Sequence, residues 1–185
     1  MLKETYRDTE SRMNKTLDAL TRELVGIRTG KATTNILDGI KVDYYGTPTP
    51  LKQVASVTAP DPKLLVVQPW EKNLVPEIIK AIQKADLGLN PISEAGIIRL
   101  PIPPLTEDRR REMVKLVKKF GEDAKVSVRN IRRDSLEALK KGQKDGKITE
   151  DELHQGQKHL QDMTDSHINK IDRMIEAKDS EVMEV

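Results

Sequence analysis

The sequence predicts an α+β protein, in which an elongated antiparallel bundle of three helices carries a small inserted α/β domain. All 10 prolines lie between Pro48 and Pro104. Because proline breaks the interior of a helix, the long flanks can be helical whereas the middle cannot. The flanks repeat apolar residues at helical spacing, and the middle alternates apolar with polar residues. We therefore assign 1–29 and 105–185 to the bundle and 30–104 to the inserted domain.

The first flank predicts one long helix. Its apolar residues follow a heptad pattern, which is typical of a helix that packs against partner helices. They are Tyr6, Met13, Leu17, Leu20, Leu24 and Ile27. Gly30 follows this pattern, at a position suited to ending the helix.

The second flank predicts two further helices. Thr106 is a good N-cap, and Glu107 and Asp108 follow in the first turn, where they suit the helix dipole. This helix continues to about Gly142, and its expected core series is Met113, Val117, Phe120, Ala124, Ser127 and Ile131. Thr149 and Glu152 have the spacing of a capping box, which starts the next helix. Its apolar stripe is Leu153, Leu160, Thr164, Ile168, Ile171, Ile175 and Val182.

The middle segment has the pattern of a mixed domain. Apolar and polar residues alternate over 40–45, and short apolar runs at 64–67 and 97–102 also indicate strands. Asn73 is placed to cap a short helix over 75–82, with Gly88 ending it. The two chain crossings between the domains, near 29–31 and 103–105, predict a hinge built from paired short linkers.

Charge is distributed unevenly although the net charge is only +2. From Thr106 to Lys147 there are 14 Lys and Arg against 8 Asp and Glu, and from Ile148 onward 4 against 10. Basic residues recur at spacings of three and four on one face of the second helix, interrupted only by Glu122. They are Arg111, Lys115, Lys118, Lys125, Arg129 and Arg132. Such a stripe favours contact with a polyanion over an ordinary solvated face.

Arginine clusters sharpen this interpretation. Arg129, Arg132 and Arg133 lie at i, i+3 and i+4, so their guanidinium groups can reach adjacent phosphates, and Asp134 is placed to restrain Arg133. A second cluster, Arg109–Arg111, opens the second helix beside the hinge, and Arg28 with Lys31 closes the first helix at the same place. The competing interpretation is solvation of helix ends and pairing with the acidic third helix.

Several other classes of protein are disfavoured. The chain has no cysteine, so disulfides and thiolate chemistry are excluded. No apolar run has membrane length, and no grouping of residues resembles a catalytic or metal site. His167 is expected to be a core or boundary residue of the bundle and not a metal ligand. Aromatic residues make up 3% of the chain, which favours phosphate contacts over base stacking. We expect a soluble, cytoplasmic protein that is not an enzyme and needs no cofactor.

Five segments then stand in an order that resembles the bacterial ribosome recycling factors. They are Ile27–Ala32, Asp43–Leu51, Asp86–Pro91, Pro103–Arg110 and Val128–Asp134. The resemblance extends over essentially the whole chain. One departure is Lys31, where many members have Arg; lysine keeps the charge and loses the bidentate geometry.

The resemblance implies an L-shaped protein with a β/α/β sandwich as its small domain. It implies binding to the 70S post-termination ribosome through large-subunit ribosomal RNA, and action with elongation factor G and GTP to separate the subunits and release them from mRNA. Arg132 and Arg129 would be the main RNA contacts, supported by Arg110, Arg28 and Lys31, with Arg133 adjacent. The implied hinge consists of Thr29, Gly30, Lys31, Pro103, Pro104 and Leu105.

Two alternative interpretations place the chain in other classes of protein. A structural coiled coil would use the same heptads to dimerise, with its basic and acidic segments paired between chains. An RNA chaperone would bind unrelated duplex RNA as strongly as it binds ribosomes. The recycling interpretation predicts a monomer, which light scattering distinguishes from a stable dimer.

Overall fold

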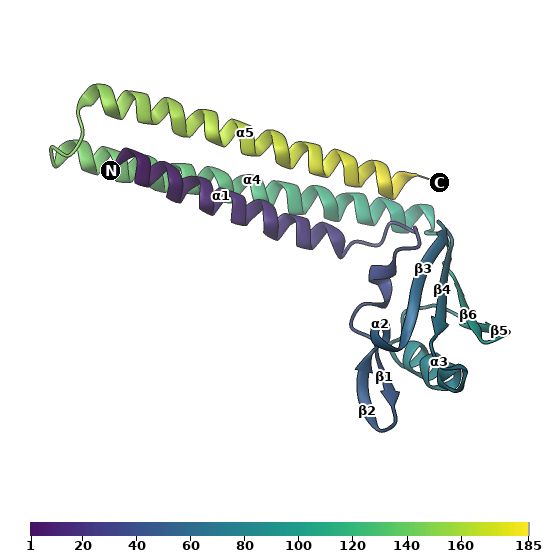
Figure 1. Ribbon diagram of the computed structural model, residues 1–185. Coiled ribbons are helices and arrows are strands. Elements are labelled where there is room, and N and C mark those ends of the chain that lie inside the picture. Colours follow the sequence, from purple (N-terminus) through teal and green to yellow (C-terminus); the bar gives the residue numbers. More distant parts are fainter. Residues whose placement is uncertain (185) are drawn as a thin grey trace. The chain divides into compact units, whose positions relative to one another are not determined.

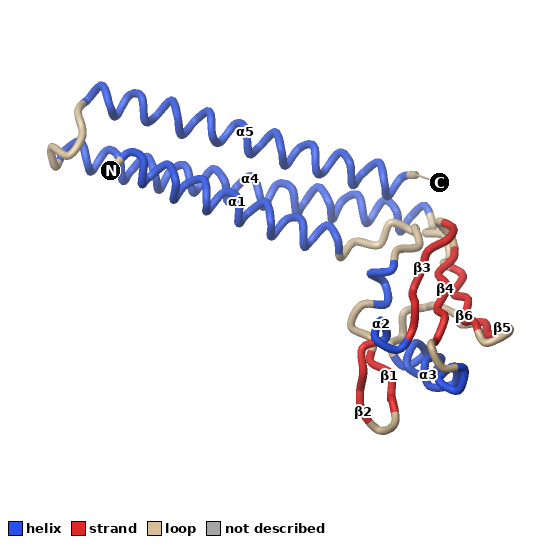
Figure 2. Tube along the Cα trace, viewed as in Figure 1, coloured by secondary structure: helices blue, strands red, loops and turns tan. Residues whose placement is uncertain are grey.

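The computed structural model describes residues 1–184 and separates the chain into two compact units. One unit consists of Met1–Thr29 together with the chain from Glu107 onward, and the other is Gly30–Thr106. Figure 1 shows long helices in the first unit, and Figure 2 shows strands in the second.

The first unit is a bundle of three long helices, α1 (Leu2–Val25), α4 (Glu107–Lys144) and α5 (Glu150–Met183). Pairs of contacts between helices fix their directions. Thr9 and Arg12 of α1 meet Ser135 and Asp134 of α4, so α1 and α4 are antiparallel. Arg132 and Lys125 of α4 meet Gln161 and Asp172 of α5, so α4 and α5 are antiparallel as well. The predicted α+β fold, with a three-helix bundle and a small inserted domain, is confirmed (Figure 1).

The bundle core runs along the whole rod. Met13, Val117, Val128 and Ile171 are each 0% exposed in its main cluster. A second cluster of Leu139, Ile148 and Leu160 closes the end where α4 turns into α5. Buried aliphatic side chains along the rod make it stiff, because dense packing leaves little room for rearrangement.

The core face of α4 differs from the predicted series at one position. Ser127 is exposed, and its neighbour Val128 takes the buried place. The cause is the central position of α4, which packs against both α1 and α5 and therefore buries a wider face than one heptad stripe. Gly121, absent from the predicted series, is buried where Ile175 of α5 approaches the backbone.

The first helix ends earlier than predicted. It stops at Val25, with Gly26 as its C-cap, and the Ile27 amide donates to the Leu24 carbonyl in the last turn. Glycine is a poor helix former, so Gly26 ends the helix before Gly30 is reached. Gly30 instead has a φ of +75° in the connection to the second unit.

The predicted capping box at the start of α5 is confirmed. The Glu152 amide donates to the Thr149 hydroxyl oxygen at 3.1 Å, and the Thr149 amide donates to Glu152 Oε2 at 2.7 Å. Both bonds satisfy amides that a helix start leaves without intrahelical acceptors. The tight turn from α4 into α5 is thus fixed on its α5 side.

The second unit contains two antiparallel sheets and one main helix. A hairpin joins β1 (Lys41–Tyr44) to β2 (Thr47–Pro50), and the short helix α2 (Leu51–Val54) follows. The larger sheet has the order β3-β4-β6-β5. Its strands are β3 (Ala55–Asp61), β4 (Leu64–Pro69), β5 (Ile92–Glu94) and β6 (Ile97–Pro101). Helix α3 (Val75–Lys84) completes the unit, with 3₁₀ turns at Thr34–Leu37 and Lys72–Leu74.

The core of this unit lies between the larger sheet and α3. Leu65 pairs with Leu100 and Val67 with Ile98, and all four side chains are 0% exposed. Ile78 of α3 belongs to the same cluster. Residues two apart on a strand share a face, so these pairs form one continuous apolar surface beneath the helix.

Two details of the small unit differ from the sequence prediction. Asn73 does not cap α3; it lies in the 3₁₀ turn, and its Nδ2 donates to the Tyr45 hydroxyl at 3.3 Å. The helix ends at Lys84, before Gly88, because Asp86 takes a left-handed conformation with φ of +50°. Aspartate tolerates that conformation better than most residues.

Candidate nucleic-acid interface

A concentration of unneutralised arginine charge lies on α4 at residues 129–133. Arg129 and Arg133 are exposed, and within residues 1–184 neither makes an ion pair or hydrogen bond. Arg132 is half-buried, and its Nη1 donates to Gln161 Oε1 on α5 at 2.6 Å. The partner of Arg132 is a neutral amide, so all three arginines keep their full charge on one side of the rod.

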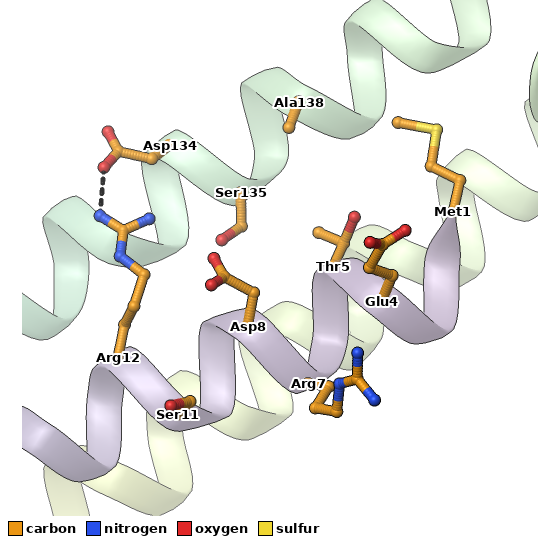
Figure 3. A pocket seen from close by; sticks show the side chains of 10 residues that line it. All are labelled: Met1, Glu4, Thr5, Arg7, Asp8, Ser11, Arg12, Asp134, Ser135 and Ala138. Carbon is orange, nitrogen blue, oxygen red and sulfur yellow. Dashed lines mark hydrogen bonds and ion pairs between the residues drawn. The ribbon is translucent and has the colours of Figure 1, made fainter.

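Asp134 lies next to this cluster and does not restrain Arg133, contrary to the sequence interpretation. Its Oδ2 accepts from Arg12 Nη2 of α1 at 2.7 Å, as Figure 3 shows. The carboxylate therefore neutralises a cation of another helix. Sequence alone gives no signal for this pair, because Arg12 and Asp134 are distant in the chain.

The rest of the predicted basic stripe is partly neutralised. Lys125 Nζ lies 2.5 Å from Asp172 and 3.4 Å from Glu122, and the hydrogen bond to Asp172 raises the pKa of the lysine. Arg111 pairs with Glu107 at 2.5 Å. The stripe that looks uniform in sequence is therefore neutralised at Arg111 and Lys125, whereas its members Arg129 and Arg132 keep their charge.

The remaining predicted RNA contacts lie elsewhere. Arg110 is half-buried near the start of α4, about 30 Å along the helix from Arg129 at 1.5 Å per residue. Its Nε is buried and has no hydrogen-bond partner among residues 1–184. Arg28 is exposed after the end of α1, and Lys31 is half-buried in the second unit. The structure thus brings Arg129, Arg132 and Arg133 together and leaves Arg110 well apart.

A groove of about 600 Å³ lies between α1 and α4 beside the Arg12–Asp134 pair (Figure 3). It is lined by Met1, Glu4, Thr5, Arg7, Asp8, Ser11, Arg12, Asp134, Ser135 and Ala138. Ser135 of the lining also shares a buried hydrogen bond of 2.7 Å between its hydroxyl and that of Thr9. Charges of both signs line the groove, so it does not concentrate positive charge as a phosphate site requires.

The six predicted hinge residues lie in two short segments. Gly30 and Leu105 are close: a β-carbon at Gly30 would lie 3.4 Å from Leu105 Cγ. The segments are also anchored at one turn, because the Ala32 amide donates to the Pro62 carbonyl at 2.6 Å and the Ile102 amide to the Lys63 carbonyl at 2.8 Å. The other hinge positions are Thr29, Lys31, Pro103 and Pro104.

His167 packs in the bundle core, as predicted. It is 3% exposed, with Nδ1 2.7 Å from the Met163 carbonyl oxygen and Nε2 2.9 Å from Asn14 Oδ1. In the part of the chain that the structure describes, no cluster of three or more His, Cys, Asp or Glu residues is arranged to hold a metal ion. Across residues 1–184, none of the helices combines the length and apolar character needed to cross a membrane.

The fold and the arginine cluster define a class of protein, a helical rod that presents cationic side chains and carries a small α/β unit. Comparison with known proteins gives the family. The family model described as ribosome recycling factor matches residues 20–183. The ribosome-recycling factor of Geobacillus kaustophilus is 52% identical over 185 residues, covering 100% of both chains. That of Acetivibrio thermocellus is 49% identical over 180 residues, covering 97% of this chain and 98% of the relative.

Solved structures agree with the sequence relatives. A solution structure of a ribosome recycling factor matches with a TM-score of 0.76 and 40% identity, covering 100% of this chain and 98% of the other. A second match has a TM-score of 0.65 and 45% identity, with 99% of each chain covered. It is a model of the T. thermophilus factor with E. coli elongation factor G, bound to the E. coli post-termination complex. The chain belongs to the ribosome recycling factor family, a family of non-enzymatic translation factors.

Proposed function

We propose that this protein binds the post-termination 70S ribosome through large-subunit ribosomal RNA and, with elongation factor G and GTP, separates the subunits and releases them from mRNA. Family membership over residues 20–183 supports this role. The matched T. thermophilus factor, bound with elongation factor G to a post-termination complex, supports the choice of partners.

The observation that carries the RNA contact is the unneutralised cluster on α4. Arg129, Arg132 and Arg133 are offered from one rigid helix, and each guanidinium can donate two parallel hydrogen bonds to a phosphate. Releasing counterions from those phosphates favours binding. Arg132 and Arg129 are the main contacts in this proposal, Arg133 is adjacent to them, and Arg110, Arg28 and Lys31 give support.

The mechanism is mechanical. The bundle anchors to RNA, and the hinge lets the small domain swing when elongation factor G pushes on it. A rod with a continuous packed core transmits force with little deformation. The two linker segments, held at the Pro62–Lys63 turn, restrict the small domain to a limited set of rotations.

The test is breakdown of post-termination complexes by the purified protein, with and without elongation factor G and GTP. Wild type is compared with Arg132→Ala and with the control Arg111→Ala, which removes the same charge from α4 at a position paired with Glu107. We expect breakdown to require all components and to fail with Arg132→Ala. That variant should bind ribosomes more weakly, with a salt dependence lower by about one phosphate contact.

Circular dichroism checks that both variants keep their helices. No breakdown by wild type with matched partner factors would overturn the proposal. A stable dimer in light scattering would then favour the coiled-coil alternative. Equal losses for Arg132→Ala and Arg111→Ala would show that total charge, and not the cluster at 129–133, determines binding.

A further inference from the structure

Arg132 is the one arginine of the cluster with a hydrogen-bond partner in residues 1–184, and that partner is itself held. Gln161 Oε1 accepts from Arg132 Nη1 at 2.6 Å, and Gln161 Nε2 donates to Asp165 Oδ1 at 2.8 Å. Gln161 and Asp165 are one turn apart on α5. A relay therefore runs from the carboxylate through the amide to the guanidinium.

The chemistry of the two neighbours fixes the orientation of the amide. An ionised carboxylate only accepts hydrogen bonds, and a guanidinium only donates them. Gln161 satisfies both only when its NH₂ group faces Asp165 and its oxygen faces Arg132. Without Asp165 either end of the amide could face α4, and one of them would oppose the guanidinium.

A neutral acceptor has a different effect from the carboxylates elsewhere on the bundle. Asp134 neutralises Arg12, Glu107 neutralises Arg111, and Asp172 neutralises Lys125. Gln161 orders Arg132 and leaves its positive charge in place. Because only Nη1 is engaged, the Nε and Nη2 donors form a free edge of the kind that binds a phosphate in bidentate fashion.

We propose that Gln161, oriented by Asp165, is a positioning residue that holds Arg132 ready for ribosomal RNA without neutralising it. This inference rests on the proposed function. It gives α5 a part in RNA recognition, although that helix lies in the acidic segment of the chain. Holding the side chain before binding lowers the entropy lost when it contacts RNA.

The first test replaces the amide by a carboxylate. Gln161→Glu puts a charge beside Arg132, whereas the control Gln155→Glu adds the same charge at an exposed position of α5. Affinity for purified 70S ribosomes is measured across a salt series. We expect Gln161→Glu to bind about tenfold more weakly than Gln155→Glu, with a salt slope smaller by about one, because a paired Arg132 no longer releases a counterion.

A second pair of variants tests the role of Asp165. Asp165→Ala and Asp162→Ala remove the same charge from α5, and Asp162 is exposed without a hydrogen bond or ion pair among residues 1–184. Electrostatics alone predicts that both variants bind ribosomes equally or slightly more tightly. The relay predicts that Asp165→Ala binds roughly twofold to fivefold more weakly than Asp162→Ala, because the amide loses its fixed orientation.

The double variant Arg132→Ala/Gln161→Glu distinguishes positioning from a general effect. If Gln161 acts through Arg132, the excess loss over Gln155→Glu disappears in the Arg132→Ala background. This inference is overturned if the wild-type protein binds ribosomes and Gln161→Glu has the same ribosome affinity as Gln155→Glu. That result leaves the proposed function intact. Wild type that does not bind 70S ribosomes overturns both.

Discussion

At the residue scale, the partner of each cation decides what that cation can do. The basic face of α4 mixes arginines held by carboxylates with arginines that keep their charge. Arg111 has Glu107 beside it, whereas Arg132 has only an amide. Exposed ion pairs contribute little to stability, so their main effect here is on the charge left for a ligand.

Asp179 of α5 gives a prediction about stability and pH. Its Oδ1 is buried without a hydrogen-bond partner among residues 1–184, and burial raises the pKa of this carboxyl despite the opposing attraction of Lys118. A carboxyl whose pKa is higher in the folded state binds its proton more tightly there. Stability therefore falls as the pH rises above the ordinary carboxyl pKa and through the raised pKa of the folded state.

Replacing Asp179 by Asn removes the charge that burial disfavours. We expect the melting temperature at pH 7 to rise by about 1–4 °C, for a gain of roughly 0.5–1 kcal/mol. The gain should disappear near pH 3, where the native carboxyl is already protonated in both states. Thermal unfolding at the two pH values measures this, with exposed Asp162→Asn as the control. A gain that is the same at both pH values would contradict the explanation.

At the element scale, close approach of helices depends on glycines in the bundle. A β-carbon at Gly121 would lie 2.7 Å from Ile175 Cγ1, near the branched base of a stiff side chain. At Gly142 the nearest atoms are Met1 Cε and Sδ, the far end of a flexible side chain at the start of the protein. The same substitution to alanine should therefore affect stability differently at the two sites.

We expect Gly121→Ala to destabilise the protein by about 1–3 kcal/mol through overpacking. Gly142→Ala should be neutral or stabilising by up to about 1 kcal/mol, because Met1 can move and alanine favours the helix. Denaturant unfolding of both variants makes the comparison. Equal destabilisation of the two variants would contradict the close approach of Ile175 of α5 to Gly121 of α4.

The sequence predicts most elements of this fold, because the signals that define them are local. Proline exclusion and apolar spacing locate the long helices, and Thr149 with Glu152 locates the start of α5. Strand β3 has no clear sequence signal because it is an edge strand in which only Ala55 is buried, and an edge tolerates proline. The end of α1 is harder to place because two glycines, Gly26 and Gly30, compete for one role.

The arginine cluster is predictable for the same local reason, since three residues within one helical turn share a face. The residues that contact this cluster and its neighbour Asp134 cannot be predicted in the same way. The pairing of Asp134 with Arg12 and of Arg132 with Gln161 joins residues of different helices, and depends on how the helices are rotated in the bundle. Side-chain contacts between elements require the packed structure, whereas the elements themselves do not.

At the scale of the whole molecule, the two units each have their own core, and short linkers connect them. In the proposed mechanism these linkers absorb the change in backbone angles when the small domain swings. Gly30 is the linker residue with the most conformational freedom, and its φ of +75° is a value that other residues rarely adopt. Its neighbour across the linker is Leu105.

Gly30→Ala tests this role against a matched control. Gly39, in the small unit, has a similar φ of +82°, and no atom lies within 4 Å of the place that a β-carbon would take, so Gly39→Ala imposes similar strain away from the linkers. Each variant should lose about 1–2 kcal/mol of stability. We expect Gly30→Ala alone to slow the breakdown of post-termination complexes several-fold at unchanged ribosome affinity, because alanine restricts the angles available to the linker. If both variants slow the breakdown of post-termination complexes by the same factor, strain at Gly30 acts only through stability. The hinge then pivots at other residues.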